Sequence, residues 1–268
     1  MNLSKYTELH WVGGALAASA ISFLYVGTGG WPGAAHECVA VADCYCEAQR
    51  VGLIAQPANT WSCLGWGVAG LWIAWNAARQ RECRAPLDPE PNPYQRSFYV
   101  GIYALVVFSL VPGGMFFHAS LTDWGGKLDI VSMYLLVNFW IFYNLARSFR
   151  WSRTTFLIAY ATTTAILLVP RVIYSAIDIG LSLFVGLIFL ALTSEIWLAS
   201  APHRRWVWVG LGSFVFAHLV QAALPCDPNS LFQPHAVLHV IEVVPLVAFY
   251  FHFFGAARLQ LAAAPPTA

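Results

Sequence analysis

Long runs of apolar residues, separated by short polar connections, follow one another along most of this 268-residue chain. A helix that crosses the hydrocarbon core of a bilayer needs about 20 predominantly apolar residues. Runs of about this length predict eight spanning helices, at roughly Trp11–Thr28, Thr60–Trp75, Phe98–Phe117, Leu128–Leu145, Thr155–Val169, Ile179–Ala199, Trp206–Leu224 and Ala236–Ala257. The predicted fold class is therefore all-α, a polytopic membrane protein.

Composition supports this class, because 59% of the residues are hydrophobic and only 10% are charged, whereas soluble domains carry about 25% charged residues. The longest connections, Gly29–Asn59 and Asn76–Ser97, are too short for a soluble domain. We therefore expect a single membrane domain over residues 1–268. Residues 1–30 form either a retained span or a signal peptide, and retention is favoured because no persuasive small-residue cleavage site follows Ile21–Tyr25.

The distribution of Lys and Arg predicts the orientation, since positively charged loops stay on the cytoplasmic side. Counting alternate connections places three basic residues on one side, Arg50, Lys127 and Arg171. The other side carries eleven: Lys5, Arg79, Arg81, Arg84, Arg96, Arg147, Arg150, Arg153, Arg204, Arg205 and Arg258. This split predicts an integral, multi-pass protein with both termini in the cytoplasm.

Three histidines converge under this topology. His118 ends a span that runs outward, and His235 begins a span that runs inward, so both are expected near the outer face. His239 lies one helical turn from His235 on the same side of the helix. Three imidazoles leave one coordination position of a tetrahedral zinc ion open, as in catalytic zinc sites. The alternative is that each histidine separately hydrogen-bonds to backbone or water at a helix end.

A carboxylate follows His118 across a turn that contains Gly125 and Gly126, which brings Asp129 to the same depth. Beside a zinc ion, Asp129 could be a ligand, could orient a ligating imidazole, or could take and return the proton of an attacking water. Its alternative role is the N-cap of the next helix. We expect the catalytic role.

These residues also carry a resemblance to a known family. The chain resembles the alkaline ceramidases, within the CREST superfamily of intramembrane hydrolases, over roughly residues 44–257. The matching segments are Asn59–Ser62, Phe117–Leu121, Leu128-Asp129 and His235–His239. The resemblance implies a seven-helix core over residues 44–257, with residues 1–30 as an additional N-terminal span. It also implies that His118, His235 and His239 bind zinc and that Asp129 acts on the attacking water.

Two positions depart from the family pattern. A serine that helps to polarise the substrate carbonyl is expected four residues before His118, where this chain has Gly114. Either Ser120, Ser132 or Tyr134 substitutes for it, or zinc alone holds the developing oxyanion; Ser120 is our catalytic candidate beside Asp129. The family's calcium loop is also eroded, because only Glu47 keeps a carboxylate in the matching segment. Calcium prefers six to eight oxygen ligands, so no calcium is expected.

The cysteines point to an oxidising compartment, because Cys38, Cys44, Cys46 and Cys226 all fall in predicted outer segments. Cys46 resembles the family's loop cysteine that is bridged to the connection before the last helix, which implies a disulfide between Cys46 and Cys226. Cys38 and Cys44 could form a second bridge. A thiolate metal site made by Cys44, Cys46 and His36 is the alternative.

The resulting expectation is an enzyme that hydrolyses an amide bond of a lipid entering from the outer leaflet. The resemblance implies ceramide or a related substrate, with a fatty acid and a sphingoid base as products. An acyl-ester lipid hydrolase and a receptor-like seven-helix protein with a structural zinc are the alternatives. No nucleic-acid partner is expected. Four further polar residues are predicted to join helices: Glu195, His218, Glu242 and His252. Glu242 also lies on the helical side of His239 and could support the site.

Overall fold

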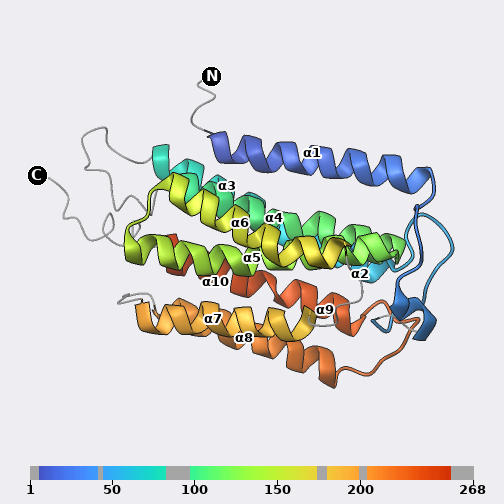
Figure 1. Ribbon diagram of the computed structural model, residues 1–268. Helices are drawn as coiled ribbons and strands as arrows, with labels where there is room; N and C mark the ends of the chain where they lie inside the picture. The colour runs from blue at the N-terminus through green and yellow to red at the C-terminus, as the bar shows by residue number, and fades with distance from the viewer. Residues whose placement is uncertain (1–5, 42–44, 83–96, 174–179, 199–203, 255–268) are drawn as a thin grey trace, which may run out of the picture.

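A computed structural model describes residues 6–41, 45–82, 97–173, 180–198 and 204–254 of the protein (Figure 1). The structure is 82% helical, and no strand occurs among the described residues, so the all-α prediction is confirmed. The elements in chain order are α1 (Thr7–Thr28), η2 (Glu37–Val41), α2 (Pro57–Ser62), α3 (Leu64–Glu82), α4 (Ser97–Ser120), α5 (Asp123–Phe149), α6 (Arg153–Ile173), α7 (Gly180–Leu198), α8 (Arg204–Ala223), α9 (Pro234–Ile241) and α10 (Val243–Phe254).

Five helical segments in the described part of the chain are long and apolar enough to cross a membrane. They are α1, α4, α5, α8 and the α9–α10 segment Pro234–Phe254. The apolar parts of α6 and α7 are shorter, Arg153–Val169 and Leu183–Glu195. These helices agree with a polytopic membrane protein, whereas the count of eight spans and the orientation of the termini stay predictions.

The helices form a bundle in which α4 packs against both α3 and α5 (Figure 1). Helix α1 lies outside α3 and α4 and buries only four of its residues, Glu8, Val12, Phe23 and Gly27. On the other side of the bundle, α7 packs against α5, and α8 packs against α10 and α9. The central helices are therefore α4, α5 and α10, whose aromatic side chains fill much of the core.

Two of the predicted spans are divided into shorter helices. The last one breaks at Glu242, between α9 and α10. Pro245 has no N–H to donate to the carbonyl of Ile241, four residues earlier, and its ring crowds that carbonyl. The second span breaks at Cys63, where the Ser62 Oγ and the Cys63 Sγ both donate to the carbonyl of Asn59, at 2.8 and 3.2 Å. These side-chain bonds compete with the helical backbone bond at that carbonyl.

Polar side chains join helices at the end of the bundle away from α9. Glu195 on α7 accepts hydrogen bonds from Arg147 on α5 and from His252 on α10. The expected helix–helix role of Glu195 and His252 is therefore confirmed. His218 instead contacts the carbonyl of Phe214 on its own helix, at 3.0 Å.

Candidate metal centre

Three imidazoles meet where the C-terminal end of α4 approaches α9. His118 lies in the last turn of α4, and His235 and His239 occupy successive turns of α9. Their potential ligand atoms all lie within 4.8 Å of one another, and the Nε2 atoms of His235 and His239 are 3.0 Å apart. His118 and His239 are almost fully buried, with 1% and 3% of their surface exposed. The structure thus brings together the three histidines that the sequence analysis selected.

The Nδ1 atom of each ring has a polar partner. His118 Nδ1 lies 3.0 Å from Gln56 Oε1, and His239 Nδ1 lies 2.9 Å from the Ser62 hydroxyl. His235 Nδ1 lies 3.3 Å from the side-chain amide of Gln221 on α8. The sequence analysis did not select these partners as site residues, although Ser62 lies in one of the segments that carry the family resemblance.

This arrangement fits a metal ion. An imidazole that donates its Nδ1 hydrogen to an oxygen presents the Nε2 lone pair to a metal, and this is the usual second contact of a ligating histidine. Gln56 Oε1 can only accept, and Ser62 already donates to the Asn59 carbonyl, so both accept a hydrogen from the ring. The third ring differs, because the atom beside His235 Nδ1 is the amide nitrogen of Gln221, a hydrogen-bond donor. Three converging imidazoles suit zinc, and a zinc ion with three protein ligands has one position for water or substrate.

Asp129 lies on α5 and lines the same cavity as His235 and His239. It does not cap the helix, because α5 begins six residues earlier, at Asp123. The N-cap is Thr122, whose side chain accepts the hydrogen bond of the Gly125 N–H. The alternative role of Asp129 as an N-cap is therefore wrong, and its carboxylate is directed to the cavity.

The cavity beside the histidines has a volume of about 470 Å³ and lies between α5, α7, α8 and α10. Its walls are mainly apolar and include side chains from each of these helices, such as Leu136, Trp140, Ile188, Leu211 and Phe249. The polar lining residues are Tyr45, Asp129, His218, Gln221, His235, His239 and Glu242. A pocket with a mostly apolar lining and a few convergent polar groups is typical of a binding site for an apolar small molecule.

Gly114 lies on α4 close to Asp129, and a larger residue there would force its neighbours to shift. A Cβ atom at this position would lie 2.7 Å from Cys63 Sγ and 2.9 Å from the Trp66 ring. The same Cβ would lie 3.6 Å from Asp129 Oδ1. The buried thiol of Cys63 therefore occupies part of the space that a side chain at position 114 would need.

The three hydroxyl groups considered as substitutes for that serine lie elsewhere. Ser120 Oγ hydrogen-bonds to Thr122 Oγ1, at 2.7 Å, in the turn between α4 and α5. Ser132 donates to the backbone carbonyl of Asp129, at 2.6 Å, and Tyr134 is buried near Phe184. None of the three is among the residues that line the cavity.

Tyr45, which the sequence analysis did not select, covers the histidines from the loop before α2. Its ring stacks on His235, with centroids 4.1 Å apart, and meets the ring of His118 at 5.3 Å. Tyr45 also lines the cavity. Burial and the charge of Asp129 raise the pKa of Tyr45 to about 12, so its hydroxyl keeps its proton at neutral pH.

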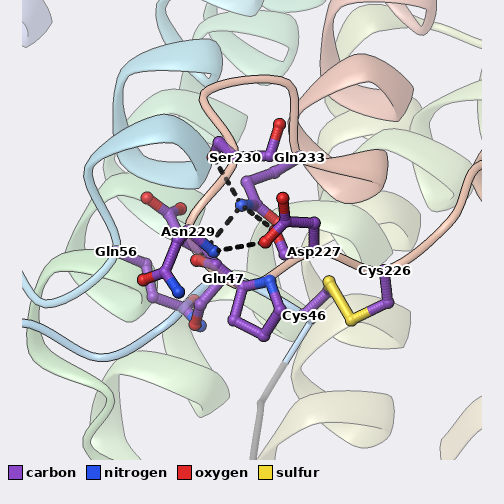
Figure 2. Close-up of a disulfide and its surroundings, with 9 residues drawn as sticks. Cys46, Glu47, Gln56, Cys226, Asp227, Asn229, Ser230 and Gln233 are labelled. Carbon is purple, nitrogen blue, oxygen red and sulfur yellow. Dashed lines mark hydrogen bonds between the residues drawn. A yellow bond between two sulfur atoms is a disulfide. The ribbon is translucent and has the colours of Figure 1, made fainter.

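The loop that carries Tyr45 is attached to the connection before α9. Cys46 and Cys226 form the expected disulfide (Figure 2), and the Ala48 N–H donates to the carbonyl of Pro228, at 2.9 Å. Because Cys46 is oxidised, the alternative thiolate metal site is wrong. The other expected bridge includes Cys44, which lies outside the described residues.

Glu47, which the sequence analysis compared with a calcium-loop carboxylate, caps α2. Its two carboxylate oxygens accept the backbone N–H groups of Ala58 and Asn59, each at 2.8 Å. Gln233 stabilises the facing connection by donating to the carbonyls of Asp227 and Ser230 (Figure 2). Both segments are thus ordered by contacts within the protein.

A comparison with protein-family models gives no match to this chain. A comparison with curated proteins also gives no match.

Proposed function

We propose that this protein is an intramembrane, zinc-dependent hydrolase that cleaves the amide bond of a lipid. The observation that carries the proposal is a cluster of three imidazoles, two of which line a largely apolar cavity together with Asp129. His118, His235 and His239 would hold the zinc ion. An ion bound there would polarise the substrate carbonyl and lower the pKa of a water molecule.

Asp129 acts as the general base in this proposal. Its carboxylate accepts a proton from the attacking water and returns it to the nitrogen of the leaving group, so the residue ends each cycle in its starting state. The cavity location of Asp129, beside His235 and His239, supports this role.

In this proposal Tyr45 has the catalytic role that a serine at position 114 would have. Its protonated hydroxyl can donate a hydrogen bond to the oxyanion that develops on the substrate carbonyl, a contact that usually contributes strongly to catalysis. Ser120 has no part in this proposal, because its hydroxyl is bonded to Thr122 and does not line the cavity.

The substrate is a lipid that reaches the site from the membrane. The apolar walls of the cavity suit hydrocarbon chains, and the resemblance to alkaline ceramidases favours an N-acyl sphingoid lipid over an acyl ester. The excess of basic residues on one side of the predicted topology favours cytoplasmic termini and a site toward the outer face.

An assay that compares two lipids tests the function. Purified protein is incubated with ceramide and with an ester lipid of the same acyl chain, each with and without a zinc chelator. We expect chelator-sensitive release of fatty acid from ceramide. Chelator-sensitive release from the ester alone would favour the acyl-ester hydrolase, and no release from either lipid would contradict the hydrolase proposal.

The receptor-like alternative predicts a closed structural zinc site. The cavity of about 470 Å³ that adjoins His235 and His239 favours the enzyme instead, because it leaves room for a substrate beside the metal ligands.

A further inference from the structure

A second carboxylate, that of Glu242, lines the cavity together with Asp129. Glu242 is the C-cap of α9 and occupies the break before α10. The break follows from Pro245, so the local sequence places this side chain at a bend in the helix.

Neither carboxylate has a partner in the described part of the protein. No hydrogen bond or ion pair reaches the side chain of Glu242 or Asp129 from the described residues, and no Lys or Arg is among the residues that line the cavity. Glu195 differs, because two side chains from neighbouring helices satisfy its oxygens. The described residues therefore do not show the helix–helix hydrogen bond that was expected for Glu242.

Two carboxylates in a largely apolar cavity are costly without a partner, because burial of a charge is compensated only by pairing or by several hydrogen bonds. The cluster of ligand atoms within 4.8 Å consists of His118, His235 and His239 and does not include Glu242. Glu242 is thus separate from the proposed zinc ligands. A cationic group of a bound ligand is the partner that would balance its charge.

We propose that Glu242 binds the ammonium group of a long-chain amine, the amine-bearing product of lipid amide hydrolysis. This inference rests on the proposed function and extends it, because it assigns a residue to the leaving half of the substrate. The apolar walls formed by side chains such as Leu136, Ile188 and Phe249 take the hydrocarbon chain. Glu242 then selects lipids whose leaving group is an amine.

The test compares the binding of an amine with the binding of an alcohol of the same chain length. A primary alkylamine is protonated at neutral pH, as lysine is, and forms a charge-assisted hydrogen bond with a carboxylate. An alcohol of the same chain length has the same apolar surface and no charge. Glu242 should therefore favour the amine by roughly tenfold or more, which is the contribution of one hydrogen bond to a charged group.

Hexadecylamine and hexadecan-1-ol are the probes. Each is titrated into the full-length, zinc-loaded protein in a neutral detergent, and apparent Kd values come from the shift in Tm. We expect the wild type to bind the amine roughly tenfold more tightly than the alcohol. Glu242→Gln should lose most of this preference. Asp123→Asn, which removes a partly exposed carboxylate from α5, is the matched control and should keep the preference.

Two more variants keep the test decisive. Glu242→Asp retains the charge and should retain part of the preference, so a general loss of folding is distinguishable from the loss of the ammonium site. Asp129→Asn should retain the preference, because Glu242 is still present. Equal binding of the two probes by the wild type, or an amine preference that persists in Glu242→Gln, would overturn the inference.

This binding measurement needs no turnover, so its result is separate from that of the proposed function. A protein that hydrolyses neither ceramide nor ester but prefers the amine through Glu242 would keep the ammonium site and lose the hydrolase proposal. Ceramide hydrolysis without an amine preference would keep the hydrolase proposal and refute the ammonium site. Zinc analysis of Glu242→Gln completes the test, because a lower zinc content would make Glu242 a metal ligand instead.

Discussion

The ring of Tyr45 stacks on the ring of His235, with centroids 4.1 Å apart and planes inclined by 24°. The two residues lie 190 positions apart in the sequence. The contact therefore joins the loop before α2 to the first turn of α9, and a residue from the N-terminal half of the chain covers a histidine from its C-terminal end.

Tyr45→Phe should lower turnover by about 10² to 10³-fold, the usual cost of removing one donor to an oxyanion. The phenylalanine ring keeps the stacking contact with His235, so zinc content and Tm should change little. The measurement is kcat for lipid hydrolysis, with Tyr25→Phe on the exposed face of α1 as the control. An unchanged kcat would remove Tyr45 from the mechanism.

His118→Ala, His235→Ala and His239→Ala should each lose most of the bound zinc, because each removes one of three converging ligand atoms. Elemental analysis of the purified protein should give about one zinc per wild-type chain. His218→Ala is the matched control, since His218 lines the cavity but lies outside the cluster. Full zinc occupancy in the double variant of His235 and His239 would refute the ligand assignment.

Asp129→Asn should keep its zinc and lower turnover by about 10²-fold or more, the range expected for the loss of a general base. Asp123→Asn, six residues earlier on the same helix, should have normal turnover. Zinc content and kcat are measured on the same preparations. Loss of zinc from Asp129→Asn would make Asp129 a ligand, and normal kcat would give it no catalytic role.

Gly114→Ser should destabilise the protein by about 1–3 kcal/mol, the usual cost of overpacking. The new Cβ atom would lie 2.7 Å from Cys63 Sγ and 2.9 Å from the Trp66 ring. Replacing the thiol at the same time, in Gly114→Ser with Cys63→Ala, should restore much of the Tm. If the double variant is no more stable than Gly114→Ser, the contact with Cys63 is not the cause.

Cys46 and Cys226 should be recovered as a linked pair by peptide mapping without reduction. Cys46→Ser should lower turnover more than it lowers zinc content, because the bridge holds the loop of Tyr45 and not the histidines. Cys63→Ser, at the buried free thiol, tests whether any cysteine change has this effect. Free thiols at both positions in freshly isolated membranes would contradict the bridge.

The sequence predicted the helices and the three histidines for the same physical reason. Apolar runs of spanning length set the positions of α4 and α9, and the spacing of His235 and His239 placed both on one helical face. The alternation of inward and outward spans then brought His118 to their depth. The structure places all three together, as that reasoning required.

Other features depend on contacts between distant segments. A hydropathy window that covers an entire span does not detect a break at Cys63 or Glu242, although Pro245 was a readable signal for the second break. The roles of Gln56 and Gln221 follow only from their distances to His118 and His235. The close contact that disfavours a serine at position 114 depends on Cys63, 51 positions earlier.

The separation of 180 residues between Cys46 and Cys226 also has a consequence for biosynthesis. A ribosome adds about 5–20 residues per second, so the first cysteine waits roughly 10–40 s for its partner to be made. The bridge, and with it the final position of Tyr45, forms only when the connection before α9 has left the ribosome. A nascent chain therefore acquires its complete site last, after most of its helices have been synthesised.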